Sequence, residues 1–157
     1  MKKFFYILLT MTILMIFSLN ALASTPTTNT SVEYYDDGSY IVTTIEDISS
    51  SPGISFSSST STTKSKTVRY YNSEDTVMWY VKVTGTFTYG NGTSKCTSSS
   101  VTAKSYVTTW KVTNKSASKS GNTAIATATA KQYFDGTVIK TINRTVKLTC
   151  SPTGVFS

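Results

Sequence analysis

Apolar and polar residues alternate along most of the chain after residue 30, and this alternation predicts β-strands. The clearest run covers residues 77–89, where every odd position is apolar, aromatic or glycine and most even positions are polar. A period of two places successive side chains on opposite faces of a pleated strand. We therefore predict a strand that buries Trp79 and turns Tyr80 outward.

Turn residues divide the chain into further strand-like runs. Glycine-containing turns at residues 36–38, 90–92 and 134–136 separate segments rich in Val, Ile, Thr and Tyr. We expect another strand at 101–113 and a turn-rich segment at 116–122. Helical periodicity is missing after the N-terminal leader. The pattern predicts an all-β fold, an antiparallel β-sandwich of about seven or eight strands with immunoglobulin-like general architecture, or alternatively a small β-barrel.

Residues 123–150 predict a hairpin whose register depends on its turn. Its first strand carries alanine at every second position, namely Ala124, Ala126, Ala128 and Ala130. A two-residue turn would set this stripe against Thr141, Asn143 and Thr145. A three-residue loop with Gly136 in the left-handed conformation would place it on one face with Val138, Ile142, Val146 and Leu148. We predict the three-residue loop because only that register gives a single apolar face.

The first 23 residues have the pattern of a secretory signal peptide. Lys2 and Lys3 precede an apolar run at residues 4–19, and small residues at Ala21 and Ala23 precede the expected cleavage site. The run is short for a membrane span of about 20 residues, so we expect cleavage and not anchoring. The mature chain is therefore expected to be secreted, free or associated with the cell surface, without a transmembrane helix.

Composition divides the remaining chain into four parts. Residues 24–31 are mostly Ser, Thr, Asn and Pro, which predicts a disordered tip, and residues 32–48 predict an N-terminal β-hairpin. Residues 49–63 contain 11 Ser or Thr residues and predict a linker. Residues 64–157 are expected to form the body of the sandwich.

Cysteine content and charge both bear on the environment of the protein. An exported chain with two cysteines predicts one disulfide, Cys96 to Cys150, with two buried thiols or an intermolecular bond as alternatives. Residues 24–63 hold five acids and no base, whereas residues 64–157 hold 13 bases and three acids. A basic body suits an anionic cell-wall polymer or another polyanion, although single lysines on strands also prevent edge aggregation. We do not expect nucleic acid as a partner of an exported chain.

Exposed aromatic residues give the candidate binding surface. Strand parity turns Tyr71 and Tyr80 outward, next to Arg69 and Lys82. Such tyrosines could stack on sugar rings or pack on a partner protein. The simpler interpretation is that they form cross-strand pairs that stabilise a solvated face.

Catalytic residue sets are missing from the sequence. The chain has no histidine, which excludes Ser-His-Asp and Cys-His sites and histidine-bound metals. Neighbouring acids on a strand point to opposite faces and do not form the facing pair of a glycosidase. We expect no catalytic residue, cofactor or metal, and a non-enzymatic module that binds an anionic cell-wall polymer, glycan or surface protein. The alternatives are an antimicrobial or pore-forming toxin that uses residues 123–150, and a cell-wall hydrolase.

The chain resembles small exported proteins of Gram-positive anaerobes. The resemblance rests on the leader, the segment YYDDGSYIVTTIED, the Ser-rich spacer and the block GTFTYGNGTSKCTSSS with a later cysteine. It covers nearly the whole chain and implies export and a β fold. These proteins have no established activity, so the resemblance implies no site residues.

Overall fold

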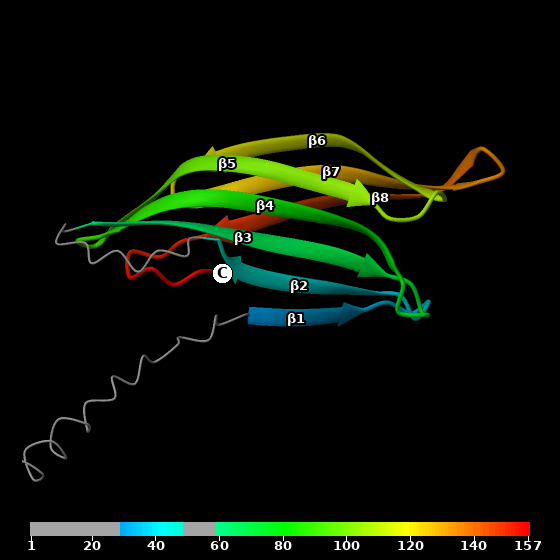
Figure 1. The fold of residues 1–157 in the computed structure, drawn as a ribbon, viewed down its shortest axis with the longest axis horizontal. Helices are drawn as coiled ribbons and strands as arrows, with labels where there is room; N and C mark the ends of the chain where they lie inside the picture. The colour runs from blue at the N-terminus through cyan, green and yellow to red at the C-terminus, as the bar shows by residue number, and fades with distance from the viewer. Residues whose placement is uncertain (1–28, 49–58) are drawn as a thin grey trace, which may run out of the picture.

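The computed structural model describes residues 29–48 and 59–157, which form two packed β-sheets (Figure 1). Sheet A has the strand order β1-β2-β3-β4-β5 and sheet B the order β6-β7-β8, with antiparallel pairing throughout. The strands are β1 (Asn29–Tyr34), β2 (Tyr40–Asp47), β3 (Thr60–Tyr71), β4 (Val77–Gly90), β5 (Thr93–Ser105), β6 (Trp110–Ser120), β7 (Thr123–Phe134) and β8 (Thr137–Thr149).

The predicted two-sheet sandwich is confirmed, and these strands do not close into the alternative barrel. Each sheet follows chain order, so the sheets are two consecutive meanders and lack the interleaved strand order of an immunoglobulin domain. Sheet B packs over β3, β4 and β5, and β1 and β2 lie beyond this overlap. Within the described ranges, no helix is long and apolar enough to cross a membrane.

The buried face of β4 forms the centre of the core, as its alternation predicts. Trp79, Val81, Val83 and Phe87 are at most 1% exposed. The alanine stripe of β7 and both tryptophans belong to the same buried cluster. The rings of Tyr70 and Trp79 stack at a centroid distance of 5.4 Å. The core therefore has a group of stacked rings at one end, and a second aromatic pair, Phe87 with Phe156, nearer the other end.

The N-terminal hairpin is an integral part of sheet A. Its predicted turn is confirmed: Gly38 has a φ of 75°, and the amide of Tyr35 donates to the carbonyl of Ser39 over 2.9 Å. Strand β1 begins at Asn29, within the segment expected to be a disordered tip. Strand β2 pairs with β3 from Tyr40 to Asp47, so the hairpin adds two strands to the body.

The expected leader and linker fall largely outside the described residues. Residues 1–23 and 49–58 lie there completely. The last residues of the expected linker, 60–63, belong to β3 and pair with β4, so this part of the prediction is wrong. The sequence did not predict this strand, because Ser and Thr occupy both odd and even positions and no alternation of apolar and polar residues is visible.

The predicted strand over residues 101–113 is broken by a turn. Strand β5 ends at Ser105 and β6 begins at Trp110. The Ser105 hydroxyl donates to the Val107 carbonyl over 2.8 Å, and the Trp110 amide donates to the same carbonyl over 3.2 Å. Side-chain and backbone bonds thus form this turn without glycine or proline, and β6 continues through most of the segment expected to be turn-rich.

The turn of the β7–β8 hairpin differs from the prediction. Its two central residues, Asp135 and Gly136, have φ angles of 45° and 75°, and Phe134 lies opposite Thr137. Such a two-residue turn matches the twist of the flanking strands. The predicted three-residue loop is therefore wrong.

A β-bulge next to this turn restores the predicted apolar face. Tyr133 lies opposite Val138, but Gln132 lies opposite Lys140, so Ile139 is the extra residue. Beyond the bulge, the stripe shares its face with the apolar residues of β8, with Ala130 opposite Ile142, Ala126 opposite Val146 and Ala124 opposite Leu148. Val138 lies on the other side of the bulge and is 42% exposed, contrary to its expected place on this face.

Candidate functional site

The four predicted binding residues lie together on the outer face, the surface of sheet A that is turned away from sheet B. Tyr70 of β3 and Trp79 of β4 point into the core, so the side chains of neighbouring parity point outward. Arg69 lies directly opposite Tyr80 across the β3–β4 pair. Tyr71 and Lys82 each follow at the next outward position of their strands, and all four side chains are half-buried.

Tyrosines from four strands, and one that follows β5, extend this surface across the sheet. Tyr34 of β1 lies 5.4 Å from Tyr40 of β2, and Tyr40 stacks on Tyr71 at 4.8 Å with an interplanar angle of 1°. On the other side, Tyr80 contacts Tyr106, just after β5, at 5.7 Å. The result is a transverse aromatic row in two halves. Arg69 lies two positions before Tyr71 on β3 and opposite Tyr80, and its guanidinium donates to the Thr44 hydroxyl over 3.2 Å.

The row is accompanied by positive charge. Lys104 lies opposite Tyr80, and its ammonium group stands 5.7 Å from the centre of the Tyr106 ring. Two acids border the surface: Glu46 on β2, and Asp75, which accepts a 2.9 Å hydrogen bond from Tyr40. Arg69, Lys82 and Lys104 therefore outnumber the acids, and the face favours anionic ligands.

Sequence reasoning missed Tyr40, Tyr106 and Lys104 as members of this surface. Tyr40 reaches the row only through the pairing of β2 with β3, which spans the segment expected to be a linker. Tyr106 and Trp110 have the same parity within the strand expected at residues 101–113, but the turn between β5 and β6 separates the two. Lys104 has the same parity as Thr102, which could have indicated that its side chain points outward. The sequence could not have shown that it lies opposite Tyr80.

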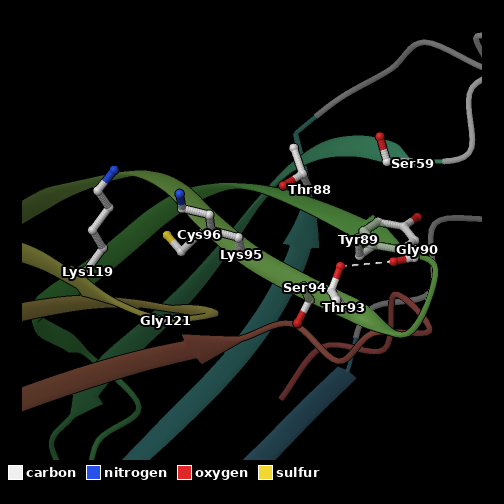
Figure 2. A pocket seen from close by; sticks show the side chains of 10 residues that line it. All are labelled: Ser59, Thr88, Tyr89, Gly90, Thr93, Ser94, Lys95, Cys96, Lys119 and Gly121. Carbon is white, nitrogen blue, oxygen red and sulfur yellow. Dashed lines mark hydrogen bonds between the residues drawn. The ribbon is translucent and has the colours of Figure 1, made fainter.

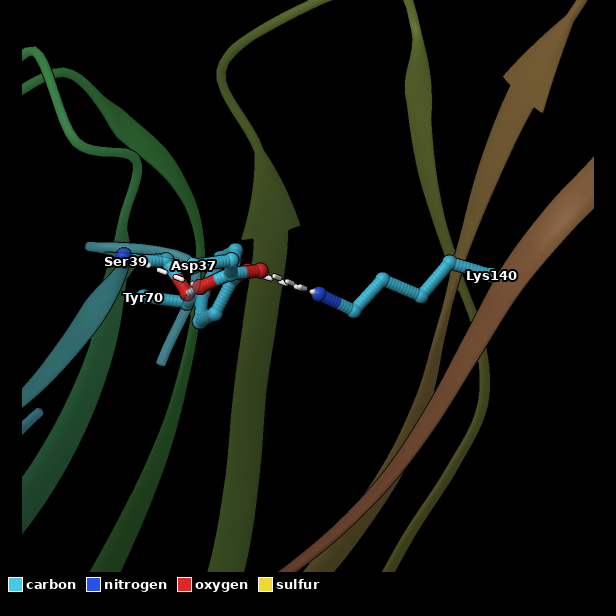
Figure 3. Close-up of polar contacts among 4 residues, drawn as sticks. All are labelled: Asp37, Ser39, Tyr70 and Lys140. Atoms are coloured by element: carbon cyan, nitrogen blue, oxygen red, sulfur yellow. Dashed lines mark hydrogen bonds and ion pairs between the residues drawn. The ribbon is translucent and has the colours of Figure 1, made fainter. Parts of the chain in front are cut away.

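A second polar cluster joins the two sheets at the end that holds the β1–β2 turn (Figure 3). Lys140 of β8 extends to Asp37 in this turn and to the Tyr70 hydroxyl, at 3.2 Å in each case. Tyr70 donates to the Ser39 hydroxyl over 2.9 Å, and Ser39 in turn donates to Asp37 through its hydroxyl and its amide. We call these four residues the Lys140 clamp.

Protonation in the Lys140 clamp favours a structural role. Hydrogen bonds from the Ser39 hydroxyl and amide, and then from Lys140, lower the pKa of Asp37 to about 2. Burial disfavours the charged form of Lys140, but hydrogen bonds with Tyr70 and Asp37 outweigh this effect and raise its pKa. Lys140 therefore stays protonated and cannot serve as a general base. Ser39, only 4% exposed, donates to a carboxylate and is not an accessible nucleophile.

Two cavities adjoin the clamp. One, of about 410 Å³, is lined by Tyr35, Asp36, Ile142 and clamp residues. The other, of about 420 Å³, lies beside Trp110, Met78 and Gln132. Their walls combine aromatic rings with the ion pair, but the polar groups of the clamp are already bonded to one another. This arrangement holds the sheets together and leaves few polar groups to orient a ligand.

A further cavity, of about 690 Å³, lies at the opposite end of the sandwich (Figure 2). Lys95 of β5 and Lys119 of β6 line it together with Cys96. The nearby hydroxyls of Thr93 and Ser94 donate to the carbonyls of Gly90 and Cys150, at 3.2 and 2.7 Å. These groups satisfy the local backbone and form no nucleophile–base pair.

The expected disulfide is not formed in the structure: Cys96 and Cys150 are free thiols, 2% and 0% exposed. The Cys96 thiol donates to the Ser98 carbonyl over 3.1 Å, and the Cys150 thiol donates to the Ser151 carbonyl over 3.3 Å. Each sulfur is thus directed to a carbonyl of its own segment. Burial raises the pKa of both thiols.

Comparison with known proteins supplies no identity for these sites. No family model, no curated protein and no solved structure matches the chain. Within residues 29–48 and 59–157, no three His, Cys, Asp or Glu side chains gather as metal ligands would. The outer face and its chemistry therefore carry the functional argument.

Proposed function

We propose that this protein is an exported, non-enzymatic binding module whose outer face holds an extended anionic glycan. The transverse tyrosine row with Arg69 at its centre is the observation that carries the proposal. Aromatic side chains offer large apolar surfaces with a polar edge, and such groups favour contact with sugar rings. Cations among them attract carboxylate or phosphate groups of the same polymer.

The geometry favours a polymer that crosses the strands. Adjacent strands are spaced by about 4.8 Å, so a row over five strands extends about 19 Å. A ligand of this length would meet Tyr34 at one edge, which is 75% exposed, and Tyr106 at the other, which is 56% exposed. Between them it would pass near Arg69, whose guanidinium donates to the Thr44 hydroxyl and keeps its charge for an anionic group. The outermost tyrosines thus provide ring contacts, and the centre provides the charge contact.

The proposed absence of catalysis rests on the chemistry of the polar clusters. Lys140 and Asp37 are held in their charged forms by each other and by Ser39. The hydroxyls of Thr93 and Ser94 near the cavity of about 690 Å³ are bonded to backbone carbonyls. These arrangements stabilise the fold and do not activate a water or a nucleophile.

Binding to immobilised polysaccharides of defined charge tests the proposal. The folded protein should be retained by an acidic polysaccharide at low salt, weakly by a neutral one, and released as salt rises. The double variant Arg69→Gln/Lys82→Gln should weaken retention about tenfold. The matched control Lys115→Gln/Lys147→Gln removes two cations from sheet B and should bind as the wild type does.

Two results would overturn the proposal. Equal loss in both double variants would show that net charge alone drives retention. Retention by acidic proteins but by no acidic polysaccharide would identify a protein partner in place of a glycan.

A further inference from the structure

The tip of the β7–β8 hairpin exposes three apolar side chains. Phe134, Val138 and Ile139 are 73%, 42% and 58% exposed. Figure 1 shows this hairpin projecting past the ends of the neighbouring strands. The bulge at Ile139 accounts for part of this exposure, because it turns Val138 away from the core face that the rest of β8 shares with the alanine stripe.

A pair of lysines stands directly behind this tip. Lys111 of β6 lies opposite Lys131 of β7, so the two share the outer surface of sheet B. Like charges in directly opposed positions of a sheet are unfavourable unless an anion neutralises them. Tyr133 lies between this pair and the tip, and the Lys111 ammonium group stands 5.0 Å from the centre of its ring.

The charge of sheet B is one-sided. Residues 110–149 contain one acid, Asp135, and seven bases, namely Lys111, Lys115, Lys119, Lys131, Lys140, Arg144 and Lys147. Two of the bases form ion pairs with sheet A, Lys140 with Asp37 and Arg144 with Glu33. Lys111 and Lys131 have no ion-pair partner among the described residues, so they are available to an external anion.

We propose that the β7–β8 tip docks this protein on the surface of an anionic lipid bilayer. From the tip inward, the order is apolar side chains, a tyrosine and then two lysines. A bilayer presents matching layers in the same order: hydrocarbon, the interface where tyrosines concentrate, and anionic headgroups. Asp135 at the apex keeps insertion shallow, because a carboxylate is repelled by anionic lipids and disfavours the hydrocarbon. This inference does not depend on glycan binding by the outer face.

Vesicle co-sedimentation tests the docking surface. The protein should sediment with phosphatidylcholine vesicles that contain phosphatidylglycerol and remain in solution with phosphatidylcholine alone. Phe134→Ser/Ile139→Ser and Lys111→Gln/Lys131→Gln should each weaken binding about tenfold. Val155→Ser is the control for the first pair, because Val155 is 66% exposed in the C-terminal segment. Lys115→Gln/Lys147→Gln is the matched control for the lysine pair.

An opposite change gives a sharper readout. Asp135→Asn keeps a residue suited to the two-residue turn and removes the negative charge at the apex, so it should tighten binding several-fold. Thermal unfolding of each variant shows that the fold is intact. Polysaccharide retention by the same variants separates failure of lipid docking from failure of the proposed glycan site.

The proposal would be overturned if the folded protein did not sediment with anionic vesicles. It would also be overturned by tip variants that bind as tightly as the wild type, or by controls that lose as much binding as the tip variants. Leakage of an entrapped dye would indicate a hairpin that spans the bilayer and would exclude shallow docking.

Discussion

A Cβ atom on Gly85 would lie 2.7 Å from the Cβ of Ala124, on the facing strands β4 and β7 of the two sheets. It would also meet the Phe87 ring at 2.6 Å. The close approach of the sheets therefore requires glycine on one side and alanine on the other. The sequence predicted the alanine contribution, since small side chains let an opposing sheet come near.

Substitution of Gly85 by alanine tests this approach. The added methyl group has no space, so the free energy of unfolding should fall by about 1–3 kcal/mol. Urea denaturation measures the change. Thr84→Ala, at the neighbouring outward position, is the control and should have a smaller effect. An unchanged midpoint for Gly85→Ala would show that the sheets are further apart.

Acid stability should depend on Asp37. Its pKa is about 2 in the folded protein and 3.8 for an unperturbed aspartate, so the charged carboxylate stabilises the fold above the higher pKa. This contribution is lost as pH falls from about 4 through about 2. The difference in Tm between the wild type and Asp37→Asn should be constant above this window and shrink within it. A difference that stays constant down to pH 2 would contradict the Lys140 clamp.

The stacked pair Tyr40 and Tyr71 should stabilise sheet A independently of ligand binding. A double-mutant cycle of Tyr40→Ala and Tyr71→Ala should give a coupling free energy of about 0.2–1 kcal/mol. Tyr40→Phe is the control that keeps the ring. Loss of the Tyr40 hydroxyl alone removes its bond to Asp75 and preserves the stack. Additive alanine effects would argue that the rings do not interact.

Both thiols should resist modification in the folded, reduced protein. Burial excludes reagents from Cys96 and Cys150 and raises the pKa of each thiol, so little thiolate is present at pH 8. A protein freed of reductant immediately before the assay should react slowly with a soluble disulfide reagent. Denaturant should release both thiols. Rapid reaction in the native state would contradict their burial.

Local periodicity predicted the parts of the fold that local rules determine. The alternation in residues 77–89 places Trp79, Val81, Val83 and Phe87 inside and Tyr80 outside, and the structure confirms this arrangement. The turn at residues 36–38 is confirmed for the same reason, since Gly38 supplies the left-handed conformation that the loop requires. Strand parity and turn chemistry act over a few residues, and the sequence shows them directly.

Features that depend on distant pairing were not accessible in the same way. The bond from Lys140 to Asp37 joins residues 103 positions apart, and no local pattern places them together. Tyr40 meets Tyr71 only because β2 pairs with β3 across an intervening segment whose composition resembles a linker. The predicted outer-face residues were therefore correct in direction, but the row that they form required the register of the whole sheet.

The turn of the β7–β8 hairpin shows how two local errors can preserve a larger prediction. The shorter turn alone would have placed the alanine stripe opposite polar residues, and the bulge at Ile139 corrects the parity. Burial of the stripe favours this register because it gives both strands one apolar face. The shared apolar face of β7 and β8 could be predicted from the pattern of hydrophobic residues. The two-residue turn and the bulge that produce this register could not.

Ile139 is also dispensable to the pairs that follow it. Removing this one residue would leave Tyr133 opposite Val138 and Gln132 opposite Lys140, in an ordinary hairpin with every subsequent pair intact. Insertion or deletion of a residue at this point therefore leaves the interior pairs unchanged. The hairpin end can thus differ in length and surface chemistry while the sandwich beneath keeps its pairing.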